Sequence, residues 1–191
     1  MEQPDWDTAT WQLLADLWID HVLALSQVRR RYAPGADEHQ VGRWLTRLAG
    51  RRAISVRRVW IPRTARARLT EKTVAVELPG SPVHQEEMAH WLGLAEMRWR
   101  LRAGLLRWQV IGHLGPEKRA HGERPDALAE DAVGVFVVEY DHGAYSVSDI
   151  KNKHRAFAEL APRQMWGVSS EQRRQWLREH LAGQGALVVT W

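Results

Sequence analysis

Three short runs in the C-terminal half of the chain carry residue types that can act on phosphate esters. Asp126 is followed thirteen residues later by Glu139 and then by Asp141, and two lysines, Lys151 and Lys153, come next. Carboxylate oxygens are the protein ligands that hard divalent cations such as Mg²⁺ prefer. Phosphoryl transfer also needs a cation, because negative charge develops on the phosphate. These are therefore side chains that metal-assisted phosphoryl transfer would use.

The pattern resembles the core of the PD-(D/E)xK nucleases, with Pro125-Asp126 as the first part of the motif and Glu139 as the second. In that family an Asp and a Glu on neighbouring strands bind a divalent metal, so the resemblance implies Mg²⁺ or Mn²⁺ bound by Asp126 and Glu139. It also implies a catalytic lysine nearby, which positions or activates the attacking water and stabilises charge on the phosphate.

The chain departs from the family pattern at position 141, where Asp141 stands in place of the motif lysine. Three alternatives follow. Lys151 or Lys153, on the next predicted helix, takes the lysine's role. Otherwise Asp141 is a further metal ligand, or catalysis is lost. Acidic residues at a strand end also occur as simple caps or solvated groups, so the motif alone does not distinguish a nuclease site from these structural roles.

The elements around these residues predict an α/β domain, and the resemblance to the PD-(D/E)xK nucleases implies that it has an αβββαβ core of the restriction-endonuclease-like type. Periodicity and caps predict the order α-β-β-β-α-β-α-β, with parallel pairing in the second half. The expected elements are a helix over about 83–101, strands over 106–113, 124–128 and 134–140, a helix from 148 or 149 to 160, a strand over 164–168, a helix from 169 or 170, and a strand over 186–191. On the last helix, Arg173, Arg174 and Arg178 are expected on the outer face.

A Pro-Gly-Ser-Pro segment at 79–82 interrupts the regular pattern and predicts a domain boundary. We therefore expect two domains, 1–80 and 81–191, and an α+β fold overall.

The first domain is predicted to be a winged helix-turn-helix. Apolar spacing predicts helices beginning near Thr8, over 26–32 and over 37–49, with Gly50 as the residue after the third helix. Two strands, over about 54–60 and 73–78, then flank a basic loop at 62–70. Helix, helix, helix and hairpin is the order of elements in winged helix-turn-helix domains.

The third predicted helix has the features of a recognition helix. Trp44 and other apolar residues mark an inward face, and Gln40, Arg43 and Arg47 lie on the opposite side. Arg can bond guanine bidentately, and Gln can do the same with adenine. The expected contacts with DNA are Gln40, Arg43, Arg47, Arg51, Arg57, Arg58, Arg63, Arg66 and Arg68.

Charge supports a polyanionic partner for this part of the chain. Residues 29–72 contain thirteen Lys or Arg and three acidic residues, a net charge of +10, whereas the whole chain carries +4, so the remainder carries −6. A basic block on an otherwise acidic protein indicates a partner such as DNA. An ordinary solvated basic surface is the alternative.

Composition excludes some classes of protein. Cysteine is absent, so disulfides and thiolate metal sites are excluded. No signal peptide or membrane-spanning run is visible, so we expect a cytoplasmic protein without membrane association. The eleven tryptophans are interpreted mostly as packing residues, with Trp18, Trp44, Trp91 and Trp99 on apolar faces.

Taken together, the two halves resemble the bacterial replication-relaxation proteins of plasmids and integrated mobile elements. The resemblance rests on the winged helix followed by a helix opened by His84, RPDA at 124–127, VEYDHG at 138–143 and a Lys-x-x-x-aromatic run at 153–157. It implies binding of double-stranded DNA and a nuclease-like domain that nicks or cleaves DNA. The alternative is a non-catalytic regulator or replication accessory whose second domain dimerises or recruits partners.

Overall fold

The structure, a computed structural model, describes residues 4–62, 70–111, 123–181 and 186–190. The chain forms two compact units of mixed helix and strand, which confirms the predicted class at that level. The N-terminal unit ends at Ala95 and the C-terminal unit continues from Glu96, so the boundary lies inside helix α4 (Met88–Leu101). Along the described parts of the chain, no helix is long and apolar enough to cross a membrane.

The division between the two units falls later in the chain than the boundary predicted near residue 80. The segment at 79–82 does interrupt secondary structure, but the start of α4 still belongs to the N-terminal unit. Gln27 and Arg31 donate hydrogen bonds to the carbonyl oxygens of Leu92 and Ala95, at 2.9 and 2.8 Å. These two bonds hold the first turns of α4 against α2 (Leu25–Tyr32).

Three helices open the N-terminal unit: α1 (Trp6–Asp20), α2 (Leu25–Tyr32) and α3 (Glu38–Gly50). Asp5 caps α1 by accepting from two backbone N–H groups, and Asp37 caps α3 by accepting from the N–H of Gln40. The third helix lies where it was predicted, except that Gly50 belongs to the helix and Arg51 is its C-cap.

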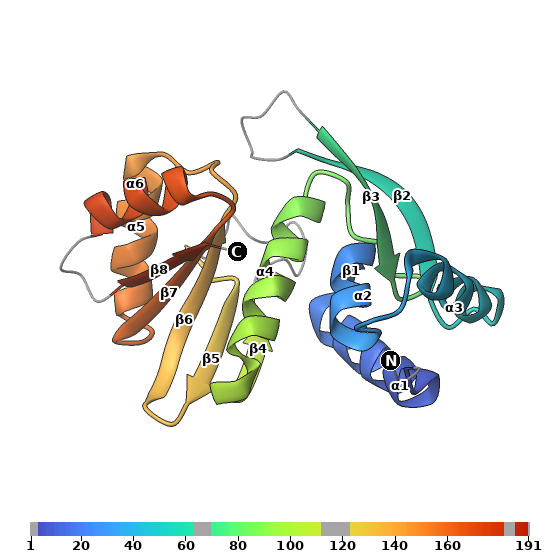
Figure 1. Ribbon diagram of the computed structural model, residues 1–191. Coiled ribbons are helices and arrows are strands. Elements are labelled where there is room, and N and C mark those ends of the chain that lie inside the picture. The colour runs from blue at the N-terminus through green and yellow to red at the C-terminus, as the bar shows by residue number, and fades with distance from the viewer. Residues whose placement is uncertain (1–3, 63–69, 112–122, 182–185, 191) are drawn as a thin grey trace. The chain divides into compact units, whose positions relative to one another are not determined.

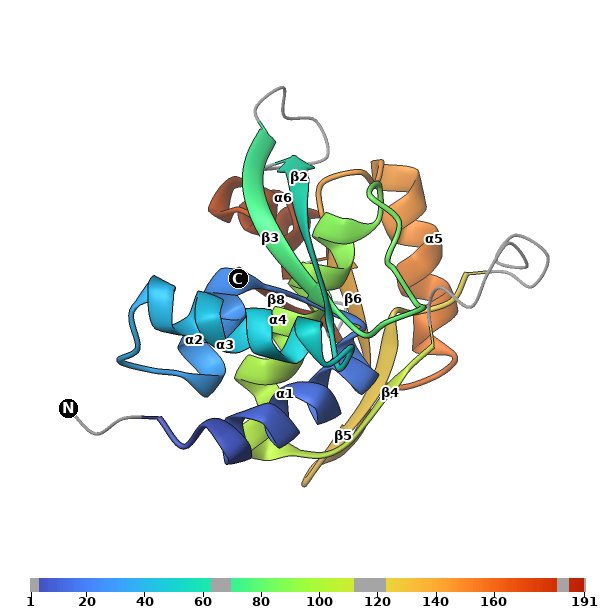
Figure 2. The ribbon, with the colours of Figure 1, turned by 90° about the vertical axis from the view of Figure 1, so that its right-hand side faces the viewer.

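The same unit contains a three-stranded antiparallel sheet in the order β1-β3-β2. Its strands are β1 (Val22–Ala24), β2 (Ser55–Pro62) and β3 (Thr70–Glu77). β2 and β3 form the predicted hairpin, which extends beyond the helices (Figures 1 and 2). β1 was not predicted, because three buried residues between two helices show no alternation of apolar and polar side chains.

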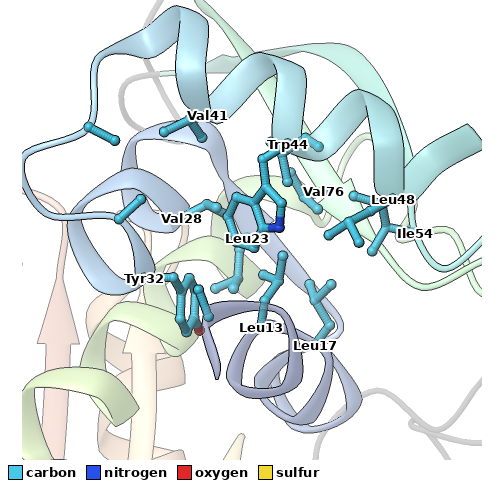
Figure 3. Packing of buried hydrophobic residues seen from close by; sticks show 14 of the residues in the cluster. Leu13, Leu17, Leu23, Val28, Tyr32, Val41, Trp44, Leu48, Ile54 and Val76 are labelled. Atoms are coloured by element: carbon cyan, nitrogen blue, oxygen red, sulfur yellow. The ribbon is translucent and has the colours of Figure 1, made fainter. Parts of the chain in front are cut away.

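Apolar side chains from the three helices and the sheet meet in one core, shown in Figure 3. Its members include Leu13, Leu17, Val28, Tyr32, Val41, Trp44, Leu48 and Val76. Trp11 and Trp18, in contrast, are 74% and 76% exposed. The prediction that Trp18 faces the core is wrong, because it follows the buried Leu17 and successive helical side chains are rotated by about 100°. Trp44 and Trp91 are buried as predicted.

The C-terminal unit is built on a five-stranded mixed sheet in the order β4-β5-β6-β7-β8. After α4 and a short 3₁₀ helix η1 (Arg102–Gly104), its elements are β4 (Leu105–Val110), β5 (Ala127–Asp131), β6 (Gly134–Asp141), α5 (Val147–Ala158), β7 (Arg163–Val168), α6 (Glu171–Leu181) and β8 (Ala186–Thr190). Neighbours up to β6 pair antiparallel, and β6, β7 and β8 pair parallel. The element order and the parallel half agree with the prediction.

Helices α5 and α6 lie on one face of this sheet (Figure 1). Ile150 and Phe157 of α5 and Leu177 of α6 pack there with Val137 and Trp166. Because side chains alternate along a strand, Glu139 and Asp141 lie on the same face of β6 as Val137. The two acidic residues are thus carried on the helix-covered face, at the carboxyl end of β6.

Candidate functional site

The sheet brings Asp126 and Glu139 together, as the sequence pattern predicted. Ala127 pairs with Val138 across β5 and β6, so the residue before β5 lies beside Glu139. The backbone N–H of Asp126 donates to Oε2 of Glu139 at 3.3 Å, and Oδ2 of Asp126 accepts from the N–H of Tyr140 at 2.7 Å. Both carboxylates are buried, at 5% and 0% exposure.

Lys153 is the lysine that reaches these carboxylates. Its Nζ lies 2.9 Å from Oε1 of Glu139, whereas Lys151 is exposed. The spacing along α5 explains the difference, because Lys153 follows the buried Ile150 by three residues and precedes the buried Phe157 by four. Of the two predicted candidates, only Lys153 joins the carboxylates, and we call Asp126, Glu139 and Lys153 the carboxylate cluster.

Tyr145 is a further member of this environment that the sequence analysis missed. Its hydroxyl donates to Oε1 of Glu139 at 2.8 Å, and the ammonium group of Lys153 lies 4.9 Å from the centre of its ring. Burial and the negative charge of Glu139 raise the pKa of Tyr145 well above its ordinary value. The hydroxyl therefore stays protonated and holds the Glu139 carboxylate in place.

The charge of Lys153 is stabilised by its neighbours. Burial lowers its pKa, but Glu139, through its charge and hydrogen bond, and the nearby Asp126 raise it above its ordinary value. Lys153 is therefore an ammonium ion at neutral pH, with an additional contact of 3.5 Å to Glu123. Such a group can stabilise negative charge but cannot accept a proton from water.

Asp141 does not join the cluster, although it was predicted as a metal ligand. Its carboxylate pairs with Arg173 of α6, with Nε donating to Oδ2 at 2.7 Å, and accepts from the N–H of Gly143 at 2.7 Å. Arg173 was expected on the outer face of α6, yet its side chain is only 14% exposed. The expectation is wrong because Arg173 precedes the buried Leu177 by one helical turn and shares its inward face.

The donor set fits a divalent cation held by two carboxylates. Across residues 4–62, 70–111, 123–181 and 186–190 there is no group of three or more His, Cys, Asp or Glu arranged to hold a metal ion. Mg²⁺, however, commonly uses one or two carboxylates and completes its shell with waters and substrate oxygens. Asp126 and Glu139 supply hard oxygen donors, and against the ammonium of Lys153 they leave the cluster with an excess of negative charge that a cation would offset.

The predicted DNA-contacting residues that the structure describes separate into two groups, exposed residues and residues with structural partners. Arg43 and Arg47 are exposed on α3, where they border a shallow pocket with His39 and Thr46, and Arg51 is exposed at the end of α3. Arg58 is exposed on the hairpin. Arg63, Arg66 and Arg68, the other predicted contacts, lie outside the described residues.

Gln40 and Arg57 have structural roles. Oε1 of Gln40 accepts from the N–H of Asp37 at 2.9 Å, which leaves its amide unable to contact adenine through both groups. Arg57 donates two hydrogen bonds to Glu77, at 2.7 and 3.0 Å, and a third to the carbonyl of Val83. Arg57 lies on the hairpin face opposite Arg58, so the prediction that both contact DNA is corrected for Arg57.

Two basic residues near Arg58 were missed as site candidates. Arg29 of α2 and Lys72 of β3 border one pocket with Arg58, beside the start of α3. Lys72 lies opposite Trp60 in the hairpin, with its ammonium 5.7 Å from the centre of the indole. Both residues lie within the basic block at 29–72, which was the signal in the sequence. The pairing of β2 with β3 places Lys72 near Arg58, and the packing of α2 against β3 brings Arg29 to the same surface.

Comparisons of the chain with protein-family models, with curated proteins and with solved structures found no match.

Proposed function

We propose that this is a DNA-binding protein whose C-terminal unit carries a metal-dependent nuclease centre. Its N-terminal unit would be a winged helix-turn-helix and its C-terminal unit a restriction-endonuclease-like domain. More narrowly, we propose a protein of the replication-relaxation type, which nicks or cleaves DNA of a plasmid or other mobile element. The observation that carries the proposal is the carboxylate cluster, in which Lys153 contacts Glu139 beside Asp126.

The arrangement of the elements supports this proposal. The series α4, β4, β5, β6, α5 and β7 follows the αβββαβ order, with Asp126 just before β5 and Glu139 near the end of β6. The motif lysine is missing from β6, and the ammonium group of Lys153 reaches Glu139 from α5 instead. A lysine supplied by the following helix was one of the alternatives left open by the sequence.

Each member of the cluster has a distinct proposed task. Asp126 and Glu139 would hold Mg²⁺ or Mn²⁺, which supplies a Lewis acid for the phosphate when bound. Lys153, as an ammonium ion, would stabilise negative charge developing on the phosphate oxygens. Tyr145 positions Glu139 through its hydrogen bond. Because Lys153 is protonated, we assign it charge stabilisation and not proton abstraction.

The two lysines of α5 offer a matched test of this assignment. We expect Lys153→Gln to lower the rate of plasmid nicking by about a hundredfold, the typical effect of losing one preorganised charged or hydrogen-bonding group. Lys151→Gln removes the same charge from an exposed position and should leave the rate unchanged. Nicking of supercoiled plasmid, with circular dichroism to verify folding, measures both. Equal effects of the two substitutions would contradict the assignment.

DNA binding by the N-terminal unit predicts a loss of affinity when the exposed arginines of α3 are removed. Arg43→Ala combined with Arg47→Ala should weaken binding of double-stranded DNA by at least about tenfold. Affinity of the unaltered protein should also fall steeply with salt, since contacts with phosphate release counterions. Fluorescence anisotropy with a labelled duplex at several salt concentrations measures both effects.

The control for this pair is Arg155→Ala combined with Arg178→Ala, which removes two exposed arginines from α5 and α6 of the C-terminal unit. It should bind the duplex as the unaltered protein does. Binding that is insensitive to salt, or equal losses in both double variants, would show that α3 is not the DNA-reading element.

A second candidate function is supported by two observations. Asp141 stands where the motif has its lysine and is bound by Arg173, and the oxygens of Glu139 already accept from Lys153, Tyr145 and the N–H of Asp126. A non-catalytic regulator or replication accessory would retain such a cluster as a structural network. In that case the C-terminal unit would mediate dimerisation or bind partners, and light scattering tests the proposed homodimer.

A further inference from the structure

A pocket of about 550 Å³ lies next to the carboxylate cluster, at the edge of the sheet where β6 and β7 end. Tyr145, which donates to Glu139, is one of its walls. The strands run parallel here, and each is followed by a helix, so α5 and α6 both begin at this pocket. Its other polar or aromatic walls include Ser146, Ser169, Ser170, Arg173 and Trp176.

Arg173 presents a fixed guanidinium group in the wall of this pocket. Its Nε donates to Asp141, its Nη2 donates to the carbonyl of Tyr145 at 2.7 Å, and the group lies 3.9 Å from the ring centre of Trp176. Within the described part of the chain its contacts use Nε and Nη2, which leaves the two N–H groups of Nη1 for a ligand. A guanidinium held in this way is preorganised to bind phosphate.

Ser169 is a second and independent indication of a ligand. Its hydroxyl oxygen is buried and has no hydrogen-bond partner among the described residues. A buried hydroxyl without a partner costs free energy, so a ligand atom that bonds to it would be stabilising. The N-terminal ends of α5 and α6 add positive potential at the same pocket, of which Asp149 and Glu171 in their first turns offset a part, so the charge of Arg173 is the main attraction for an anion.

We propose that this pocket binds a phosphate group of a nucleic-acid strand. Arg173 and Ser169 contact the phosphate oxygens, and the ring of Trp176 packs against the adjoining sugar or base. The inference rests on the proposed function, because the strand would be the DNA on which the carboxylate cluster acts. The phosphate in the pocket is a neighbour of the phosphate at the cluster, and it fixes the register of the strand.

The test uses two single-stranded probes, tetrathymidylate with a 5′-phosphate and tetrathymidylate with a 5′-hydroxyl. Binding to the full chain is measured by calorimetry in EDTA, so that no cleavage occurs. Four nucleotides without a complement provide no duplex groove for α3. Arg173→Gln should weaken binding by about tenfold, as expected for a charge-assisted hydrogen bond, and Ser169→Ala by several-fold.

Matched controls separate the pocket from general charge effects. Arg174→Gln removes a neighbouring arginine that pairs with Glu171 and does not line the pocket, and Ser55→Ala removes an exposed hydroxyl in β2. Both should bind as the unaltered protein does. If Arg173→Gln fails to fold, Ser169→Ala still decides, because it breaks no hydrogen bond between described residues.

The outcomes distinguish the source of the phosphate. Preference for the 5′-phosphorylated probe, lost in Ser169→Ala, identifies a terminal phosphate. Equal binding of both probes, weakened in the same variant, identifies an internal phosphodiester. Absence of binding, or binding unchanged in both pocket variants, overturns the inference. Nicking without phosphate binding contradicts only this pocket, and phosphate binding without nicking contradicts only the proposed nuclease activity.

Discussion

Glu139→Gln is expected to lower the rate of nicking of supercoiled plasmid in Mg²⁺ or Mn²⁺ by about two to three orders of magnitude. The substitution keeps the size of the side chain but removes the charge that would hold the cation and that faces Lys153 at 2.9 Å. Asp126→Asn should have a similar effect, because it removes the charge of the other carboxylate that would hold the cation. Its amide oxygen can still accept from the N–H of Tyr140, so the local fold should be kept. Gel conversion of supercoiled to open-circular plasmid measures the rate.

The same variants should bind duplex DNA as tightly as the unaltered protein, because the arginines of α3 are untouched. Calorimetric titration with Mn²⁺ provides a readout independent of activity, in which binding is expected for the unaltered protein and not for Glu139→Gln. Glu130→Gln, at a half-buried site on β5 outside the cluster, is the matched control. Nicking that persists in Glu139→Gln would contradict the nuclease assignment. No Mn²⁺ binding and no nicking by the unaltered protein would favour the non-catalytic regulator.

Much of the carboxylate cluster could be predicted because it follows from local rules. An acidic residue just before one strand and another near the end of its antiparallel neighbour must lie close together. The choice between Lys151 and Lys153 could also have been made from the sequence, since Lys153 shares the apolar face of Ile150 and Phe157. Tyr145 was harder, because it lies between β6 and α5, where no periodicity fixes the direction of a side chain.

The contacts that reassign Arg57 and Arg173 required the tertiary structure. Both arginines bind carboxylates far along the chain, Glu77 and Asp141, and their residue types alone are equally suited to DNA contacts. Gln40 is different, because Asp37-x-x-Gln40 is a capping-box pattern that is readable from sequence. Tertiary packing decides which arginine is buried and which is exposed. The composition and net charge of a segment therefore do not predict that Arg57 and Arg173 bind carboxylates.

Arg31→Met is expected to lower the free energy of unfolding of the N-terminal unit by about 3–5 kcal/mol, the cost of removing one partner of a buried ion pair. The side chains of Arg31 and Asp20 are 0% and 2% exposed, and Nη1 lies 3.5 Å from Oδ2. The substitution leaves the Asp20 carboxylate buried without this cation and the carbonyl of Ala95 without a donor. Chemical unfolding followed by tryptophan fluorescence measures the change.

Two further variants separate the ion pair from other effects. Arg30→Met changes the exposed neighbouring residue and should alter stability by no more than about 0.5 kcal/mol. Asp20→Asn combined with Arg31→Met removes both charges and should recover part of the loss, because the uncompensated carboxylate is gone. If Arg31→Met were no more destabilising than Arg30→Met, the buried pair would contribute nothing to stability.

The position of Arg31 makes the result relevant to function, since it binds α4 at Ala95 and the same helix continues into the C-terminal unit. Loss of that bond should destabilise the N-terminal unit. All three residues of the carboxylate cluster belong to the C-terminal unit, so the binding of Mn²⁺ should be unchanged.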